Sequence, residues 1–319
     1  MKTKLAFLLL IAIATLLSCS ETPDDKKTKE NVKDTTDLKI AIMPVIDCLP
    51  FYVADEQQIY KKLGLNVRFI SYKSLLKCGE VFENGRVDGT FATLPEAMYL
   101  KAGGKDLKIV MRTEGDMDVI ANHAKRIKKL SSMRERLVAI TRHSTEDYLS
   151  DEIANITNIP TFDILRPQIN DIFIREQMLL NNQVDAAVMP QPYAEILRKE
   201  GHSKVFSTKN SGIKFGCIVI SDTVTKSKSE KIELLLKGYS QAAEAIEKNR
   251  KNADSVLIKQ YRIPAKMLDS VSIPKYPKPQ NVNSKDFDKA MNWCISRKYV
   301  KERIKENDII TSKFIHDER

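Results

Sequence analysis

The sequence lacks the motifs on which common enzyme sites depend. Its 319 residues include one tryptophan and four histidines, and the histidines have no metal-ligand spacing. The patterns G-x-S-x-G, H-E-x-x-H and G-x-G-x-x-G and the P-loop are all missing. We therefore expect no metal, no cofactor and no catalytic residue, and the sequence favours a protein that binds its ligand without converting it.

Cysteine is also sparse. Five cysteines are present, and the four beyond Cys19 are far apart with no C-x-x-C spacing, so a zinc site is not expected. Cys78, Cys217 and Cys294 lie in segments with the pattern of core elements, and we expect these three to be buried and reduced. The sequence leaves open whether any of them, or Cys48, forms a disulfide.

The amino terminus has the pattern of an export signal. An apolar run over residues 5–17 follows two lysines; it is shorter than the ~20 residues of a membrane span but suits a secretory signal. The run ends in Leu16-Leu17-Ser18-Cys19, which resembles the bacterial lipobox. We predict a signal peptide over residues 1–18 and lipidation of Cys19, which would anchor the exported protein to the cell membrane or outer membrane, on its periplasmic or extracellular face. A plain signal peptide with an incidental cysteine is the alternative.

A polar segment follows the signal. Residues 19–37 are mainly Ser, Thr, Pro, Asp and Lys, with one aliphatic residue, Val32, so we predict a flexible tether. Residues 1–37 contain six lysines and six acidic residues, so the net charge of +10 belongs to the rest of the chain. This excess could favour an anionic ligand or membrane surface, or simply form a solvated lysine-rich surface; an exported protein meets no nucleic acid.

The remaining chain contains two matching units. Val87-Asp88 and Val184-Asp185 each start a short run of small and β-branched residues, and a proline follows seven positions after each aspartate, at Pro95 and Pro192. Helix-like segments precede and follow both runs. Each unit therefore has the pattern of helix, turn, buried strand, loop and helix, which is typical of an α/β sheet between helices. Two such units predict two lobes.

The lobe boundaries follow from the order of the expected strands. We expect the first lobe to comprise residues 38–119 and 215–319, and the second lobe residues 120–214. The chain should leave the first lobe near residues 118–121 and return through the apolar strand at 215–220. Two crossings predict a two-stranded hinge.

Two helices are also predicted in the first lobe. Residues 49–63 should form one helix, which Gly64 ends. Ser227 and Glu230 match a capping box at the start of a long helix whose apolar residues repeat every three or four positions.

Ligands of open α/β sheets bind beyond the carboxyl ends of the strands. The loops at residues 93–96 and 189–193 fall at such ends, one in each lobe, and both would line a cleft between the lobes. Residues 142–146 follow another expected strand, and Ser144 or Thr145 is placed to cap the next helix. Ordinary α/β packing without a ligand is the alternative.

The order of these parts carries a family resemblance. The lipobox and tether precede a strand at Lys39-Ile40-Ala41-Ile42, then Asp47-Cys48-Leu49-Pro50, then the two Val-Asp units, which end in Pro95-Glu96 and Gln191-Pro192-Tyr193. This order resembles the substrate-binding proteins of ABC importers, in the type II group of sulfonate, nitrate and thiamine-precursor binders (the SsuA/NMT1/THI5-like family). The resemblance implies an α/β periplasmic-binding-protein fold of type II, with two lobes, each a mixed sheet flanked by helices, and a double-stranded hinge.

The resemblance also implies a function. A monomeric, lipid-anchored protein would close its lobes on one small organic or anionic solute and deliver it to a membrane permease that works with an ATPase. The cysteine-rich motif of the THI5 enzymes is missing, which argues against their catalysis. Arg112 and Arg142 could bind an anion or could equally face solvent. The implied ligand-binding residues are Asp47, Cys48, Ser71, Tyr72, Thr93, Glu96, Ser144, Thr145, Gln191 and Tyr193.

Two other functions stay open at this point. An enzyme on the same fold could use Glu96 or His143 as a base, and it would show turnover, whereas a receptor would show one-to-one binding and a raised melting temperature. A sensor could use closure to signal to a membrane partner. The sequence does not identify the solute.

Overall fold

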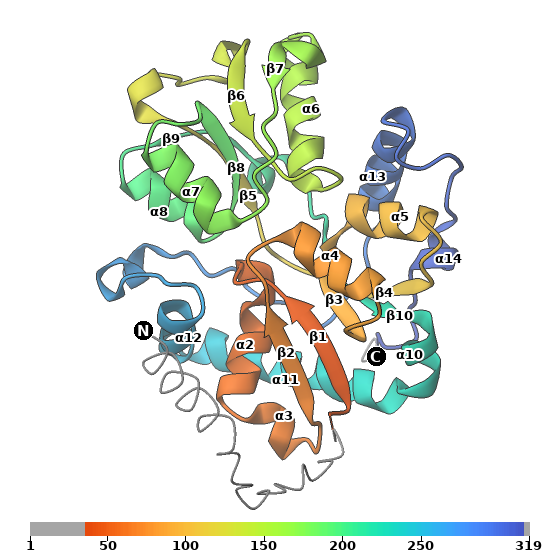
Figure 1. Cartoon of the computed structure of the whole chain (residues 1–319). Coiled ribbons are helices and arrows are strands. Elements are labelled where there is room, and N and C mark those ends of the chain that lie inside the picture. The colour runs from red at the N-terminus through yellow and green to blue at the C-terminus, as the bar shows by residue number, and fades with distance from the viewer. Residues whose placement is uncertain (1–35, 316–319) are drawn as a thin grey trace, which may run out of the picture. The chain divides into compact units, whose positions relative to one another are not determined.

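Two five-stranded sheets organise residues 36–315, the part of the chain that the computed structural model describes (Figure 1). The first sheet has the order β2-β1-β3-β10-β4 and the second has the order β7-β6-β8-β5-β9. The strands of the first sheet are β1 (Leu38–Ile42), β2 (Val67–Ser71), β3 (Gly89–Thr93), β4 (Leu107–Arg112) and β10 (Gly216–Ser221). Those of the second are β5 (Met117–Ala121), β6 (Arg136–Ala139), β7 (Ile164–Leu165), β8 (Ala186–Pro190) and β9 (Ser203–Ser207).

Helices flank both sheets, as the predicted fold requires. The α-helices are α2 (Leu49–Glu56), α3 (Ile59–Lys62), α4 (Leu75–Glu83), α5 (Leu94–Ala102), α6 (Thr145–Thr157), α7 (Ile172–Leu180), α8 (Tyr193–Lys199), α9 (Thr208–Ser211), α10 (Asp222–Ser227), α11 (Ser229–Lys248), α12 (Asp254–Lys259), α13 (Ser284–Ser296) and α14 (Glu306–Ile309). Short 3-10 helices are η1 (Ile46–Cys48), η2 (His123–Lys125), η3 (Leu130–Ser132), η4 (Thr161–Asp163), η5 (Arg250–Ala253) and η6 (Ala265–Ser270). We call each sheet with the elements packed on it a lobe.

Each sheet is mixed, and its antiparallel neighbours involve the strand that arrives from the other lobe. In the first sheet β10 runs antiparallel to β3 and β4, whereas β1 is parallel to β2 and β3. In the second sheet β5 runs antiparallel to β8 and β9, whereas β6 is parallel to β7 and β8. The predicted α/β fold with two mixed sheets is therefore confirmed.

The two Val-Asp units perform the same local task in the two lobes. The Asp88 carboxylate accepts a hydrogen bond from the Lys39 amide of β1 at 2.7 Å. The Asp185 carboxylate accepts one from the Leu137 amide of β6 at 2.9 Å. Each aspartate therefore ties the turn before its own strand to the start of a parallel neighbour, and every residue of β3 and β8 is buried. This shared geometry explains the repeat in the sequence.

The chain crosses between the lobes twice, through segments that are bonded to each other. Residues 113–116 join β4 to β5, and the Thr113 amide donates to the Gly216 carbonyl at 2.9 Å, at the start of the returning strand. The sequence placed the first boundary at residue 119, but this position lies inside β5, which pairs only with strands of the second sheet. The first crossing is thus a few residues earlier than we expected, because all of β5 is needed to pair with β8 and β9.

Two helix predictions are wrong in detail. The expected helix over residues 49–63 is interrupted between α2 and α3, because Gln58 adopts a left-handed conformation with φ of 56°. Ser227 does not cap α11; it ends α10 and donates its hydroxyl to the Thr223 carbonyl at 2.8 Å.

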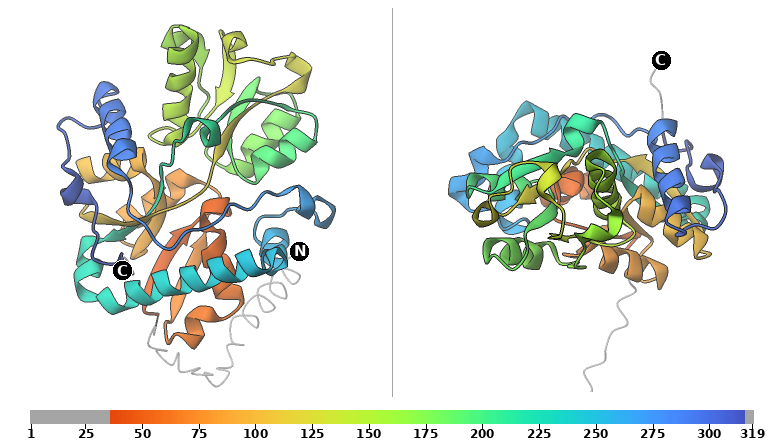
Figure 2. Two further views of the ribbon diagram at one scale, coloured as in Figure 1. Left: turned by 180° about the vertical axis from the view of Figure 1, so that it is seen from behind. Right: turned by 90° about the horizontal axis from the view of Figure 1, so that it is seen from above.

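The apolar face of α11 is buried as predicted. Seen from behind, this helix runs across the first sheet (Figure 2). Its Tyr239 ring lies 5.1 Å from the ring of Phe51 on α2. This packing gives the first lobe a core that contains Cys48 and Cys78, and all four described cysteines are free and buried.

The amino-terminal predictions fall mainly on residues that the structure does not describe. The signal peptide, Cys19 and the tether up to residue 35 lie outside the described range. The last tether residue, Asp37, belongs to the folded lobe, where its carboxylate accepts hydrogen bonds from the Asn66 amide at 3.0 Å and from Lys231 at 3.1 Å. Between residues 36 and 315, none of the helices combines the length and apolar character needed to cross a membrane.

Candidate functional site

The start of α5 carries two buried polar atoms that have no partner in the described protein. Thr93 is the residue before α5 and is 1% exposed, and its Oγ1 makes no hydrogen bond. Glu96, in the first turn, is 6% exposed, and its Oε2 is also without a partner. The Thr93 backbone hydrogen-bonds to the Glu96 carboxyl, so only one half of the Thr-x-x-Glu capping box is formed. The Thr93 hydroxyl and one Glu96 oxygen are therefore left for another group.

The surroundings of Glu96 disfavour its charge. A Cβ added to Gly79 of α4 would lie 2.7 Å from Glu96 Oε1, so the carboxyl is packed directly against that helix. Its charge interacts with the buried thiols of Cys78 and Cys217. Burial raises the pKa of Glu96 well above its usual range, and nearby Glu146 raises it further, against the hydrogen bond from Thr93. Glu96 is therefore protonated over a wider pH range than an exposed glutamate.

The start of α6, in the second lobe, presents a similar group. Ser144 caps this helix: its Oγ accepts from the Glu146 amide at 3.0 Å and donates to the Thr141 carbonyl at 2.6 Å. Thr145 is 4% exposed and its Oγ1 is unpartnered. The Ser144 hydroxyl is thus fully engaged, whereas the Thr145 hydroxyl is available.

Glu146 forms a buried ion pair within the second lobe. Its Oε2 lies 2.8 Å from Nη1 of Arg175, whose side chain is 0% exposed, and accepts from the Thr141 amide at 2.5 Å. Arg175 also donates to the Val188 carbonyl at 2.7 Å. This ion pair fixes the loop before α6 to β8, and it leaves the guanidinium with no free side.

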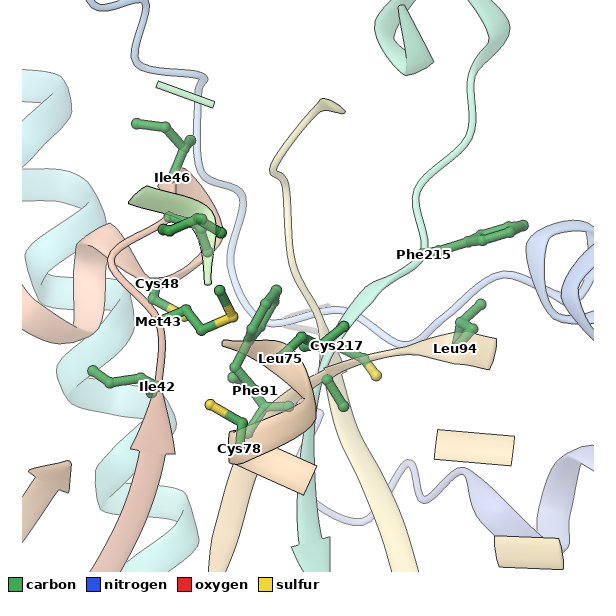
Figure 3. Close-up of a cluster of buried hydrophobic side chains, with 14 of the residues drawn as sticks. Ile42, Met43, Ile46, Cys48, Leu75, Cys78, Phe91, Leu94, Phe215 and Cys217 are labelled. Atoms are coloured by element: carbon green, nitrogen blue, oxygen red, sulfur yellow. The ribbon is translucent and has the colours of Figure 1, made fainter. Parts of the chain in front are cut away.

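Aromatic contacts bring the two helix starts together. The Leu94 amide of α5 donates to the Phe215 carbonyl at 2.7 Å, and the Phe215 ring lies 5.0 Å from the ring of Tyr148. Tyr148 is three residues after Thr145, so the two share a face of α6. Figure 3 shows Leu94 and Phe215 at one end of the first sheet, beyond Cys217. We call Thr93, Glu96, Ser144 and Thr145, with the first turns of α5 and α6, the interlobe site.

A cavity reaches Glu96 from the outer side of these helices. It has a volume of about 210 Å³ and lies between α4, α5 and the loop before α6. Tyr99 and His143 line it and stack on each other across the two lobes, with ring centroids 4.0 Å apart. Burial lowers the pKa of His143, so this ring is neutral near pH 7. Arg142 also lines the cavity and is exposed.

Two predicted site residues, Asp47 and Cys48, lie against the hinge and in the core. The Asp47 carboxylate accepts hydrogen bonds from Thr113 Oγ1 at 2.5 Å and from the Gly115 amide at 3.0 Å, both on the first crossing. Cys48 is fully buried in the core of the first lobe. Both side chains therefore contact other parts of the protein and are not available to a solute.

The loop after β8 forms a second contact between the lobes. The Ile46 amide donates to the Gln191 carbonyl at 2.9 Å, and the Tyr193 hydroxyl donates to the Pro44 carbonyl at 2.8 Å. The Gln191 side chain donates to Asp118 at 3.0 Å. The Gln191 carbonyl and the Tyr193 hydroxyl therefore bind the first lobe, and the Gln191 side chain binds its own lobe.

The remaining predicted residues lie at the end of β2. Ser71 is exposed, and its hydroxyl lies 2.6 Å from that of Tyr52; Tyr72 is half-buried. Of the ten predicted ligand-binding residues, the structure thus brings Thr93, Glu96, Ser144 and Thr145 together. Arg112 is paired with Glu114 at 3.1 Å and hydrogen-bonded to Gln280 at 2.7 Å.

Sequence reasoning missed several residues around the interlobe site. They are Gly79, Glu146, Tyr148, Arg175 and Phe215. The spacing of Thr145 and Tyr148 on one helical face was a usable signal. The partnership of Glu146 with Arg175 had none, because these residues are far apart in the chain.

The arrangement provides hydrogen-bonding groups from both lobes. Within residues 36–315, no cluster of three or more His, Cys, Asp or Glu side chains could hold a metal ion. Burial raises the pKa of the Cys78 and Cys217 thiols, which keeps them protonated and weakly nucleophilic. The site is therefore suited to hold a small polar molecule between the lobes.

Comparisons with known proteins support the fold on which this site lies. Residues 31–155 match the model of the NMT1-like family. The structure is similar to the alkanesulfonate-binding protein SsuA from Xanthomonas axonopodis pv. citri bound to MOPS, with a TM-score of 0.75 and 13% identity over 86% of this chain and 97% of that one. It is also similar to the aliphatic sulphonate-binding protein SsuA from Escherichia coli, with a TM-score of 0.71 and 15% identity over 86% and 91% of the two chains.

A third similar structure is an enzyme. The desulfurization enzyme DszB has a TM-score of 0.64 and 10% identity over 86% of this chain and 97% of that one. No curated protein sequence matches the chain. The family match and these structures confirm the resemblance to the SsuA/NMT1 group, and at such identities the structural likeness is one of fold.

Proposed function

We propose that this chain, which has the fold of the periplasmic binding proteins and resembles the SsuA/NMT1 group, is the solute-binding component of an ABC importer. Its two lobes close on one small solute, and the closed protein delivers that solute to a membrane permease driven by an ATPase. The names of the similar sulfonate-binding proteins support a binding role. The absence of an evident nucleophile at the interlobe site supports it as well.

The unpartnered atoms of the interlobe site carry this proposal. Thr93 Oγ1 and Glu96 Oε2 come from the first lobe, and Thr145 Oγ1 comes from the second. Each buried polar atom without a partner costs about 1–3 kcal/mol. A solute that bonds to atoms of both lobes removes this cost only when the lobes are together. Solute binding therefore stabilises the closed arrangement over the open one.

The hinge supplies the motion. The two crossing segments are bonded to each other through Thr113 and Gly216, and the Asp47 carboxylate holds the first of them. Rotation about these segments separates α5 from α6 without breaking either sheet. The contacts of Gln191 and Tyr193 with the first lobe then open together with the interlobe site.

A lipid on Cys19 holds the protein at the membrane beside its permease. The lipobox-like sequence before Cys19 supports this step. Mass spectrometry of the exported protein should find a diacylglyceryl group on an amino-terminal Cys19, and Cys19→Ser should release the protein into the soluble fraction. An unmodified chain that keeps residues 1–18 would contradict the anchor.

Titration calorimetry and thermal unfolding of the full chain test the binding function. We expect one-to-one binding of at least one compound from a panel of sulfonates, pyrimidines, flavins, amino acids and inorganic anions, with a rise in melting temperature. Thr145→Val should weaken that binding, whereas Thr223→Val, at an exposed position on α10, should not. Equal affinity of the Thr145 variant and the parent would place the solute elsewhere.

An enzyme is the second candidate, because DszB shares the fold. In this function Glu96 would act as a buried acid. It predicts that the bound compound is consumed during incubation, which mass spectrometry of the mixture detects. Recovery of the unchanged compound after many binding cycles would reject the enzyme and leave the binding protein.

A further inference from the structure

Carboxylates already occupy both helix starts that meet at the interlobe site. A helix N-terminus carries a partial positive charge and commonly binds an anion. Here Glu96 lies in the first turn of α5, and Glu146 and Asp147 lie in the first turn of α6. The Asp147 carboxylate accepts from the His143 amide at 3.1 Å, so it too is turned to its own helix start. An anionic solute would meet these carboxylates before it met a free amide.

Two of the three nearest arginines are committed to carboxylates. Arg175 is fully buried and bound to Glu146. Arg297 approaches Asp147 at 3.8 Å and Asp151 at 3.5 Å. Arg142 is exposed and shares the outer cavity with two further carboxylates, those of Glu80 and Glu83. The buried residues described around Glu96 therefore include no unpaired cation, since Arg142 is exposed to solvent, and burying an unpaired anion costs several kcal/mol.

The groups that are available instead suit a hydrogen-bond donor. Glu96 Oε2 is buried and can accept a bond, and each of the two threonine hydroxyls can accept or donate one. The Phe215 and Tyr148 rings beside them provide apolar and aromatic surface. A ligand with N–H groups and a compact apolar or planar body matches all of these features.

We propose, on the premise that the chain is a solute-binding protein, that its solute carries no net negative charge and donates N–H hydrogen bonds to Glu96. Amines, amidines, amides and amino-substituted heterocycles belong to this class. The fold is shared with proteins named for sulfonate binding, but the interlobe site of this chain selects against sulfonates. Glu96 is thus the residue that determines specificity.

Proton release on binding distinguishes a cationic solute from a neutral one. The charged and titratable groups near Glu96 are Glu146 with its partner Arg175, and the thiols of Cys78 and Cys217. Glu80, Glu83, Arg142 and His143 line the cavity that reaches it. Burial and the charge of Glu146 raise the pKa of Glu96 and favour its protonated form in the free protein. A cationic solute ionises Glu96 and releases a proton on binding, whereas a neutral solute releases none.

Calorimetric titration of the full chain at pH 6 provides the test. The probes are putrescine as a cation, cytosine as a neutral amino-heterocycle, and ethanesulfonate and nitrate as anions. We expect a donor probe to bind and the anions to bind at least tenfold more weakly or not at all. Repeating the titration in buffers of different ionisation enthalpy counts the protons released, and we expect release with putrescine only.

Variants locate the effect. Glu96→Gln keeps the size of the side chain but cannot ionise, so it should weaken binding of putrescine about ten- to one-hundredfold, the scale of a hydrogen bond to a charged group. Glu96→Leu removes the acceptor altogether and should weaken binding of cytosine as well. Glu233→Gln, on the exposed face of α11, removes a carboxylate elsewhere and should leave affinity unchanged. Rescue of binding in Glu96→Asp, with a shorter carboxylate, would further support the assignment.

The outcomes distinguish the two proposals. Tight binding of ethanesulfonate or nitrate overturns the solute class and leaves the binding function intact. Putrescine binding that survives Glu96→Gln unchanged, or cytosine binding that survives Glu96→Leu unchanged, also overturns it. Failure of all four probes to bind rejects the class as stated, and failure of the wider solute panel as well rejects the binding function.

Discussion

A single added methyl group at Gly79 should weaken solute binding without weakening the fold. Gly79 lies inside α4, and a Cβ there would sit 2.7 Å from Glu96 Oε1, 3.5 Å from Glu96 Cδ and 3.9 Å from a Leu100 methyl. Only the first distance is too short. Ordinary contact begins near 3.4 Å, so Gly79→Ala must displace the oxygen by about 0.7 Å, the difference of the two distances.

The expected size of the effect follows from two opposing contributions. Replacing glycine by alanine inside a helix stabilises the folded state by about 0.5–1 kcal/mol. Moving the Glu96 carboxyl costs little stability, because it is the end of a flexible side chain. Misplacing the same carboxyl weakens its hydrogen bond to the solute, and the loss of such a bond is worth about 1.5–3 kcal/mol, or more than tenfold in affinity.

Differential scanning calorimetry and titration with the bound probe measure the two quantities. We expect Gly79→Ala to keep or raise the melting temperature and to bind at least tenfold more weakly. Gly103→Ala is the matched control, because its Cβ would meet only backbone oxygens at 3.4 and 3.5 Å. Unchanged affinity in Gly79→Ala would refute the placement of Glu96 at the solute, and loss of folding would refute the packing of α4 on α5.

Three further predictions concern stability and closure. Asp47→Ala should lower the free energy of unfolding by about 2–4 kcal/mol in urea titrations, because it leaves the buried Thr113 hydroxyl and the half-buried Gly115 amide of the hinge unpaired. Asp47→Asn should lose less, and equal losses would show that the carboxylate is not the hinge acceptor. Burial raises the pKa of Glu176 to about 7. The folded state therefore holds a proton between the usual glutamate pKa and about 7, and stability falls as the pH rises through that range. The free energy of unfolding of Glu176→Gln should be about 1–3 kcal/mol higher than that of the parent at pH 8 but equal to it at pH 4. The same difference at both pH values would contradict the raised pKa of Glu176. Tyr193→Phe removes a hydroxyl bonded to the opposite lobe and should weaken binding of any solute about threefold to tenfold. Calorimetry with two unrelated solutes should show the same factor for both, and different factors would mean that the hydroxyl contacts the solute.

The sequence predicts the fold best where a local pattern has one physical solution. Each Val-Asp unit gives a buried strand whose aspartate must find a backbone donor, and in both lobes it does so on the neighbouring strand. The periodic apolar residues of α11 could only be buried on one side. By contrast, nothing local signals the left-handed turn at Gln58 that divides the first expected helix.

Site residues are harder to predict, because position at the end of a strand does not decide which partner a side chain finds. Asp47 and Glu96 are both carboxylates at such ends. Asp47 is satisfied by the hinge, and Glu96 keeps a free oxygen. The difference depends on Thr113 and Gly79, which are distant in the sequence and meet these carboxylates only in the folded chain.

Closure of the two lobes on a solute can be measured as a distance. The four described cysteines are buried and free, so spin labels attach selectively to Arg68→Cys on β2 and Phe162→Cys, an exposed position in η4 of the second lobe, once Cys19 is replaced by serine. Double electron–electron resonance then reports the separation of the lobes. We predict a broad distribution without solute and one narrow, shorter distance at a putrescine concentration that just saturates the parent. At that same concentration the Glu96→Gln variant should keep most of the broad distribution. An identical distribution with and without a solute that calorimetry shows to be bound would contradict closure.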